Sequence, residues 1–68
     1  MPTSADLAQR QIDRFRITVD EQRRSIVQLA ADGRDTAKAE AILQTMIDLL
    51  HRMEQHRDEI AAHRKAPG

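Results

Sequence analysis

Cysteine is missing from this sequence, so disulfide bonds and thiolate metal sites are excluded. Aromatic residues are nearly missing, because Phe15 is the only one. Eleven basic residues balance eleven acidic ones, which argues against a chain that grips nucleic acid or anionic lipid through bulk charge. No apolar run exceeds three residues, whereas a helix that crosses a membrane needs about 20.

Length sets a second limit. The 68 residues give room for one small domain, 1–68, and a chain of this size rarely buries enough apolar surface to be stable without a staple, a metal or a partner chain. The first residues, MPTSADLAQR, contain no apolar signal-peptide core, so we expect a cytoplasmic protein.

Glycine and proline are scarce, and Gly33 is the only one in the interior of the chain. It lies in the segment ADGRDT, residues 31–36. Glycine favours the left-handed position just past a helix end, and Asp35 or Thr36 can cap a helix that follows. The segment therefore predicts a tight turn between two long helices.

The sequence on either side of the turn is helical in pattern. Thr3 or Ser4 can cap a first helix, and Asp6 lies in its first turn, where a negative charge suits the helix dipole. No stretch alternates as a strand does. The sequence predicts an all-α fold, an antiparallel two-helix hairpin with helices at about 4–31 and 36–63 and frayed ends at 1–3 and 64–68.

Steps of three and four residues give each helix an apolar seam. In the first helix only Gln22 interrupts it: Ala5, Ala8, Ile12, Phe15, Val19, Gln22, Ile26 and Leu29. The seam predicted for the second helix is Ala39, Ile42, Met46, Leu49, Met53, His56, Ile60 and His63. Folding about the turn sets Met53 near Phe15 and Leu49 near Val19, which predicts the register.

A second apolar stripe on the second helix lies outside this predicted seam: Leu43, Ile47 and Leu50. One partner helix cannot cover both stripes, and each apolar side chain left in water forfeits about 1.5–3 kcal/mol. We expect Leu43, Ile47 and Leu50 to contact a second copy of the chain, so that two hairpins form a four-helix bundle. The alternatives are another helical protein as partner, or a monomer with an exposed apolar patch.

The histidines do not have metal-site spacing. His56 and His63 lie seven residues apart, whereas ligand pairs on a helix are usually three or four apart, and His51 lies on another face. No metal and no other cofactor is predicted. Because the charge of histidine changes between pH 5 and 8, we expect assembly to weaken in acid.

No motif of catalysis is present. There is no cysteine nucleophile, no glycine-rich phosphate loop and no converging Ser/His/Asp set, and a slim hairpin offers no deep pocket. The sequence predicts that this chain is not an enzyme but a homodimeric module for protein–protein interaction or regulation.

An RNA-binding regulator is the alternative function. A heptad hairpin that pairs into a four-helix bundle resembles in architecture the repressor-of-primer proteins of plasmids, which bind paired RNA loops along the first helices of the dimer. In this sequence phosphate contacts can come from Arg10, Arg14, Arg24 and Arg34. Acidic residues interrupt that face, namely Asp13, Asp20 and Glu21.

The stretch IVQLAADGRDTAKAEAILQTMIDLLHRMEQHR, residues 26–57, covers the turn and most of the second helix. It resembles the short helical-hairpin proteins of proteobacteria, which have a GxDT-type turn followed by a leucine-rich helix and for which no function is assigned. This resemblance implies a hairpin in a bacterial cytoplasm and implies no activity.

Overall fold

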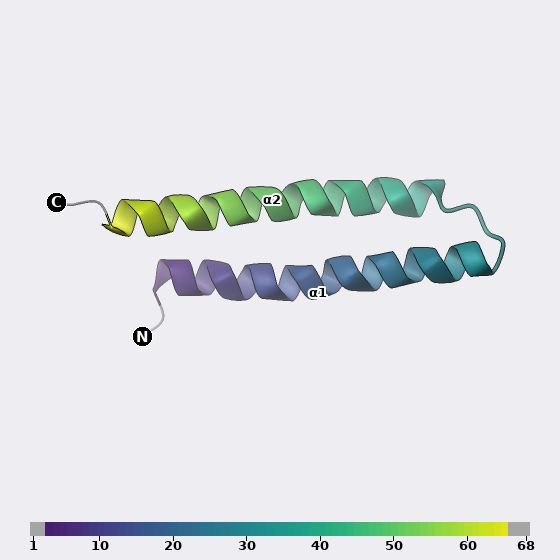
Figure 1. The fold of residues 1–68 in the computed structure, drawn as a ribbon, viewed down its shortest axis with the longest axis horizontal. Helices are drawn as coiled ribbons and strands as arrows, with labels where there is room; N and C mark the ends of the chain where they lie inside the picture. Colours follow the sequence, from purple (N-terminus) through teal and green to yellow (C-terminus); the bar gives the residue numbers. More distant parts are fainter. Residues whose placement is uncertain (1–2, 66–68) are drawn as a thin grey trace.

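The computed structural model describes residues 3–65 of the chain, with side chains over 3–63. Helix α1 (Ser4–Ala31) and helix α2 (Ala37–Lys65) lie antiparallel, side by side, with the turn at one end and both outer helix ends at the other (Figure 1). The predicted all-α hairpin is confirmed. Helix α1 has the predicted bounds, whereas α2 begins at Ala37 rather than 36 and ends at Lys65 rather than 63. Of the ends predicted to fray, 1–2 and 66–68 lie outside the described residues.

Thr3, one of the two predicted caps, caps α1, so the range predicted to fray does not extend to it. Its hydroxyl accepts the backbone N–H of Asp6 at 3.1 Å, and the Asp6 carboxylate accepts the backbone N–H of Thr3 at 3.1 Å. This reciprocal capping box satisfies two N–H groups that the first helical turn leaves without partners.

The turn begins with a Schellman motif centred on Gly33, which has a φ of 73°. Its N–H donates to the carbonyl of Ala30 at 3.0 Å, and the N–H of Arg34 donates to the carbonyl of Leu29 at 2.9 Å. Only glycine adopts this left-handed geometry without cost, so the predicted role of Gly33 is confirmed.

Helix α2 starts on the predicted cap. The carboxylate of Asp35 accepts the N–H of Ala37 at 2.9 Å, and the carbonyl of Thr36 accepts the N–H of Glu40 at 2.8 Å. Three polar residues after Gly33 are therefore enough to reverse the chain and begin a new helix.

The seam of α1 is the one that the sequence predicts. Among residues 3–63, Ile12 and Val19 are the two buried side chains, 0% and 3% exposed. The remaining seam residues are half-buried: Ala5, Ala8, Phe15, Gln22, Ile26 and Leu29. The heptad pattern of α1 admits one apolar path, and the structure follows it.

The seam of α2 differs from the prediction. Its half-buried residues follow steps of four and three: Ala39, Leu43, Met46, Leu50, Met53, Arg57 and Ile60. Ile42 and Leu49, which we expected to pack on α1, are 50% and 47% exposed. The two histidines of the predicted seam are exposed as well. The observed and predicted seams of α2 therefore share every second residue, and at the positions between them the observed seam uses the next residue along the chain.

Arg57 explains the difference. The observed seam of α2 contains an arginine, and a prediction that places only apolar residues in the seam excludes it. The Arg57 side chain is 24% exposed, and its guanidinium reaches Gln9 of α1 at 2.9 Å. Arginine can cover apolar surface with its methylene stem while its charged head stays near water.

The hairpin is a single layer. Its extents are 57 × 21 × 10 Å and its accessible surface is 5480 Å², whereas a compact monomer of 7.8 kDa exposes about 4,400 Å². Over the part of the chain that the structure describes, neither helix is apolar enough to cross a membrane.

Candidate interaction surface

The layer has two long faces, each built from one flank of each helix. Flank residues repeat every seven positions on either side of a seam. We call ionic face the one formed by Gln9, Arg16, Arg23 and Ala30 of α1 with Glu40, Ile47, Glu54 and Ala61 of α2. We call open face the one formed by Ser4, Gln11, Thr18 and Ser25 of α1 with Ile42, Leu49, His56 and His63 of α2.

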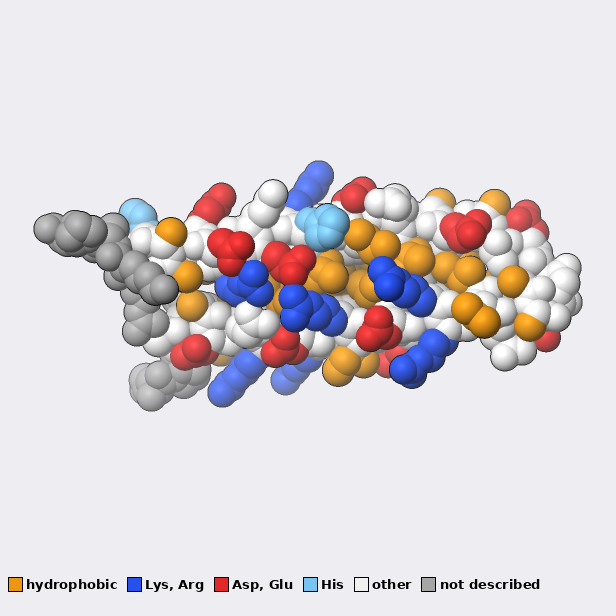
Figure 2. Space-filling model, viewed as in Figure 1, with side chains coloured by type: hydrophobic (Ala, Val, Ile, Leu, Met, Phe, Trp, Pro, Cys, Tyr) orange, Lys and Arg blue, Asp and Glu red, His pale blue; other side chains and the backbone are white. Residues whose placement is uncertain are grey.

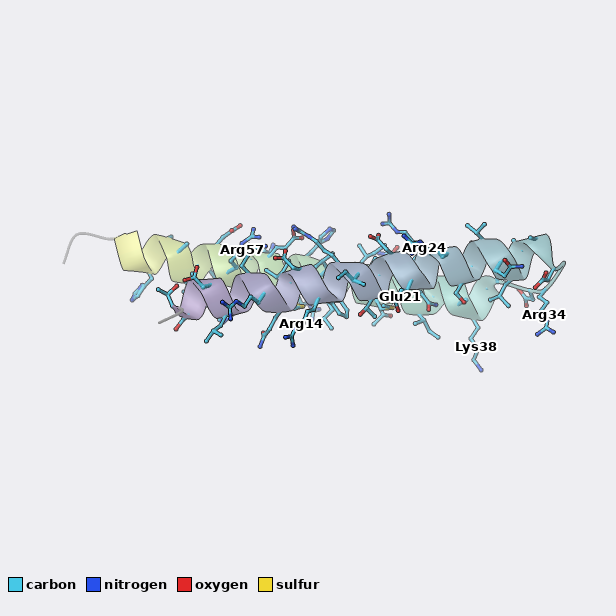
Figure 3. The ribbon with its side chains drawn as sticks, turned by 90° about the horizontal axis from the view of Figure 1, so that it is seen from below. Arg14, Glu21, Arg24, Arg34, Lys38 and Arg57 are labelled. Carbon is cyan, nitrogen blue, oxygen red and sulfur yellow. The ribbon has the colours of Figure 1, made fainter. Side chains whose placement is uncertain are left out.

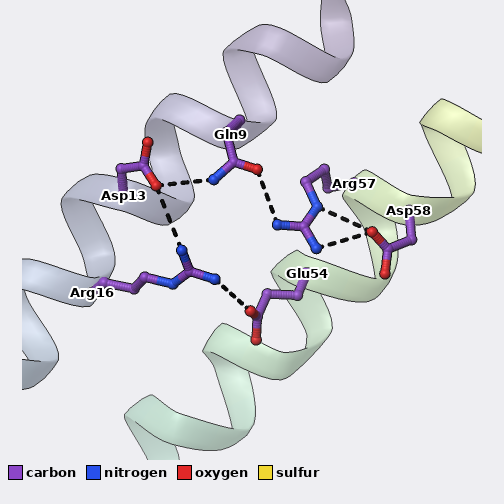
Figure 4. A network of polar contacts seen from close by, with 6 residues as sticks. All are labelled: Gln9, Asp13, Arg16, Glu54, Arg57 and Asp58. Atoms are coloured by element: carbon purple, nitrogen blue, oxygen red, sulfur yellow. Dashed lines mark hydrogen bonds and ion pairs between the residues drawn. The ribbon is translucent and has the colours of Figure 1, made fainter.

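An ion pair bridges the helices on the ionic face. Arg16 Nη2 donates to Glu54 Oε2 at 2.7 Å, and Arg16 Nη1 lies 3.7 Å from Asp13 Oδ1 (Figure 4). This pair joins residues one position after Phe15 and Met53, which agrees with the predicted pairing of those two residues, whereas Leu49, predicted beside Val19, is exposed. The Arg16 side chain is 47% exposed, and exposed pairs contribute about 0–1 kcal/mol, so the bridge orients the helices more than it stabilises them.

Arg57 extends this bridge into a network. It donates to Gln9 Oε1 at 2.9 Å and, from Nε and Nη2, to Asp58 Oδ1 at 3.1 and 2.9 Å. Gln9 in turn donates to Asp13 at 2.9 Å (Figure 4). Charged side chains therefore meet across both helices on the half of this face away from the turn, and apolar side chains show between them and the turn (Figure 2).

Gln22, the polar residue of the α1 seam, makes a second kind of bridge. Its Nε2 donates to the backbone carbonyl of Ala39 at 3.0 Å and is partly buried. This bond links the last turns of α1 to the first turn of α2, and it fixes how the two seams meet beside the turn.

The open face carries no formal charge at its flank positions, apart from the ionisable histidines. Its α1 side is small or amide-bearing, and its α2 side presents Ile42 and Leu49 at about half exposure. Half-buried side chains of the seam border these two residues, among them Met46 and Met53. Edge-on, Arg57 lies at the upper edge with the ionic face, while Arg14 and Lys38 project from the lower edge and rim the open face (Figure 3).

A hollow of about 650 Å³ lies at the end of the open face away from the turn. It is lined by the start of α1 and the last turns of α2: Thr3, Ser4, Ala5, His56, Glu59, Ile60 and His63. Ala5 is small, which leaves room where a larger seam residue would fill the space. The sequence contains the signal for this hollow, since alanines begin the seam of α1 opposite the histidines of α2.

The residues predicted to contact a partner take other places. Leu43 and Leu50 are half-buried in the seam of α2, and Ile47 is half-buried on the ionic face. The two apolar stripes of α2 therefore exchange the predicted roles. Leu43 and Leu50 pack on α1, and the apolar side chains that α1 leaves exposed are Ile42 and Leu49. Pairing itself stays a prediction.

The arginines predicted to contact RNA are all exposed: Arg10, Arg14, Arg24 and Arg34. Arg14 and Arg24 lie on opposite edges of α1, and Arg34 lies in the turn (Figure 3). None of the four forms an ion pair with another described residue. They are available to a phosphate group but do not converge on one spot.

Among residues 3–63, no three His, Asp or Glu side chains are arranged to hold a metal ion. His51, His56 and His63 are all exposed. In the comparisons with known proteins, no family model, no curated protein and no solved structure matches the chain.

Proposed function

We propose that this protein is a non-enzymatic interaction module that acts as a homodimer, two hairpins packing into a four-helix bundle. The observation that supports the proposal is the single-layer core, in which Ile12 and Val19 are the only described side chains that are buried. Protein domains are built from at least two packed layers around a common core. A second copy supplies the missing layer.

Surface area supports the same proposal. The chain exposes about 1,100 Å² more than a compact monomer of its mass. A stable interface buries about 800 Å² per partner, roughly 20–30 residues a side, and one long face comprises eight flank residues together with the seams of both helices. Covering one face of the layer is therefore sufficient.

The open face is the better candidate for pairing. Pairing through the ionic face would bury the Arg16–Glu54 ion pair. Removing such a pair from water costs several kcal/mol per ion, which is comparable to or larger than the attraction between the two charges. Pairing through the open face buries Ile42 and Leu49 among flank positions that carry no fixed charge.

Sedimentation equilibrium tests this proposal. The chain is expected at twice 7.8 kDa, and the double variant Ile42→Ser/Leu49→Ser is expected to dissociate at least about 100-fold more readily, since four buried side chains are lost per dimer. The control is Ile17→Ser/Val27→Ser, which removes side chains 60% and 69% exposed on α1 and is expected to stay dimeric. A folded wild-type chain of 7.8 kDa at millimolar concentration contradicts the proposal. Dissociation caused by Ile47→Ser would instead assign pairing to the ionic face.

RNA binding is the second candidate, favoured by the exposed arginines without ion pairs on α1. For a duplex, each phosphate contact lowers the logarithm of the association constant by about 0.9 for every tenfold increase in salt concentration. If RNA is the ligand, affinity for a structured RNA is expected to fall steeply between 50 and 200 mM salt, roughly tenfold or more. Arg14→Ala/Arg24→Ala is then expected to flatten that slope, with Arg52→Ala of α2 as control. No binding at low salt rejects this candidate.

A further inference from the structure

We infer that the hollow at the end of the open face is the seat for Ile42 of a second copy, and that the two copies lie antiparallel with α2 against α2. This inference rests on the proposed homodimer, whose sense of pairing it specifies. The occupant is a second copy rather than another protein because the face is uncharged at its flanks, large enough for a stable dimer and complementary to itself.

A two-fold axis can bring two open faces together in two ways. With the axis along the length of the layer, both turns lie at the same end and the two hollows face each other. About 650 Å³ per copy then stays unfilled, and each α2 packs on the small polar flank of α1. With the axis across the layer, each hollow faces the turn half of the other copy, where Ile42 projects.

Residue spacing fits the crosswise axis. Ile42, Leu49, His56 and His63 repeat every seven residues, and the first and last are about 31 Å apart along the helix. An axis between Leu49 and His56 sets Ile42 of one copy beside His63 of the other, and Leu49 beside His56.

The flank of α1 obeys the same symmetry. Under this axis Ser4 lies opposite Ser25, and Gln11 lies opposite Thr18, so uncharged polar residues meet one another. Apolar side chains of α2 meet the partner's α2, and the charged residues Arg14 and Lys38 stay at the rim in water (Figure 3). No fixed charge of a flank position is buried, and the one fixed charge that lines the hollow is the carboxylate of Glu59, which the seated Ile42 lies beside.

A charge-pair cycle tests the seating. Ile42→Lys and His63→Glu each place a charge at an exposed position that leaves the monomer seam intact. Each single variant is expected to weaken dimerisation about tenfold or more, and the double variant is expected to associate more tightly than either, because residue 42 of one copy meets residue 63 of the other. A double variant weaker than both singles overturns the antiparallel seating. Circular dichroism checks that all three remain helical.

Spin labels give an independent measurement that leaves the interface untouched. Ala41 and Ala62 are exposed, 21 residues apart, on the outward side of α2. With one nitroxide per chain on Ala41→Cys or Ala62→Cys, a mixed sample is expected to contain a distance shorter than either same-site distance. Same-site distances shorter than the mixed one overturn the seating. Absence of coupling between chains overturns the homodimer itself, which separates the two failures.

Discussion

Ile12 is the residue on which this hairpin depends most. It is the only described side chain fully removed from solvent, although the same helix carries Ile17 at 60% exposure. Two identical side chains five residues apart on α1 thus differ completely in what they contribute to folding, because one faces α2 and the other faces water.

We therefore expect Ile12→Ala to lower the free energy of unfolding by about 2–4 kcal/mol, through lost burial and a residual cavity. Ile17→Ala is the matched control and is expected to change it by no more than about 0.5 kcal/mol. Urea denaturation followed by circular dichroism measures both. Equal effects of the two substitutions would mean that α2 does not pack on Ile12.

Arg57 gives a second prediction at this scale. If its stem covers the seam, Arg57→Met keeps most of the stability, within about 1 kcal/mol, because the lost bonds are near the surface. Arg57→Ala removes the stem and is expected to cost about 1–2 kcal/mol more than Arg57→Met. Thermal unfolding compares the two, and a larger loss in the methionine variant would assign the contribution to the guanidinium instead.

The two helices show, at the scale of the element, what the sequence was able to predict. In α1 the apolar residues leave one seam, so its buried side was predicted from spacing, while its bounds were predicted from the cap residues and Gly33. In α2, Ile42 stands beside Leu43 and Leu49 beside Leu50, so two seams share Met46 and Met53. Choosing between them required the reach of Arg57 to Gln9, which is a property of the packed pair and of neither helix alone.

The candidate surface was predicted in part for the same reason. That α2 has more apolar width than α1 covers follows from composition, and exposed Ile42 and Leu49 agree with it. Which stripe is left over depends on a rotation of α2 by less than one residue position. The alanines of α1 indicate where the hollow lies, but its lining by Glu59 and Ile60 of α2 is a property of the packed pair.

Gly33 of the turn gives a prediction about how the two helices are joined. A methyl group added to Gly33 meets no atom within 4 Å, so Gly33→Ala tests the backbone conformation alone. We expect it to cost about 1 kcal/mol, because the φ of 73° is strained for an L residue. Gly33→Asn is expected to cost less, since asparagine tolerates this region. Thermal melts rank the three chains, and an unchanged midpoint in the alanine variant would indicate that the Schellman turn is dispensable.

Concentration dependence is the prediction for the whole molecule. If folding is coupled to pairing, mass action stabilises the folded state as protein concentration rises. A hundredfold increase is expected to raise the unfolding midpoint by about 5 °C or more. Circular dichroism melts from micromolar upward measure the shift. A midpoint independent of concentration, with a molecular mass of 7.8 kDa, would describe a stable monomer.

The outer ends of α1 and α2 lie together, at the end of the layer opposite the turn (Figure 1). Neighbouring ends of this kind make a fold suitable for circular permutation. In such a permuted chain a short linker joins the end of α2 to the start of α1, and the chain is opened within residues 32–36. Helix α2 then precedes α1 in the sequence, and every seam contact is kept. The fold then depends on which side chains of the two helices contact each other, and not on the order of the two helices in the chain.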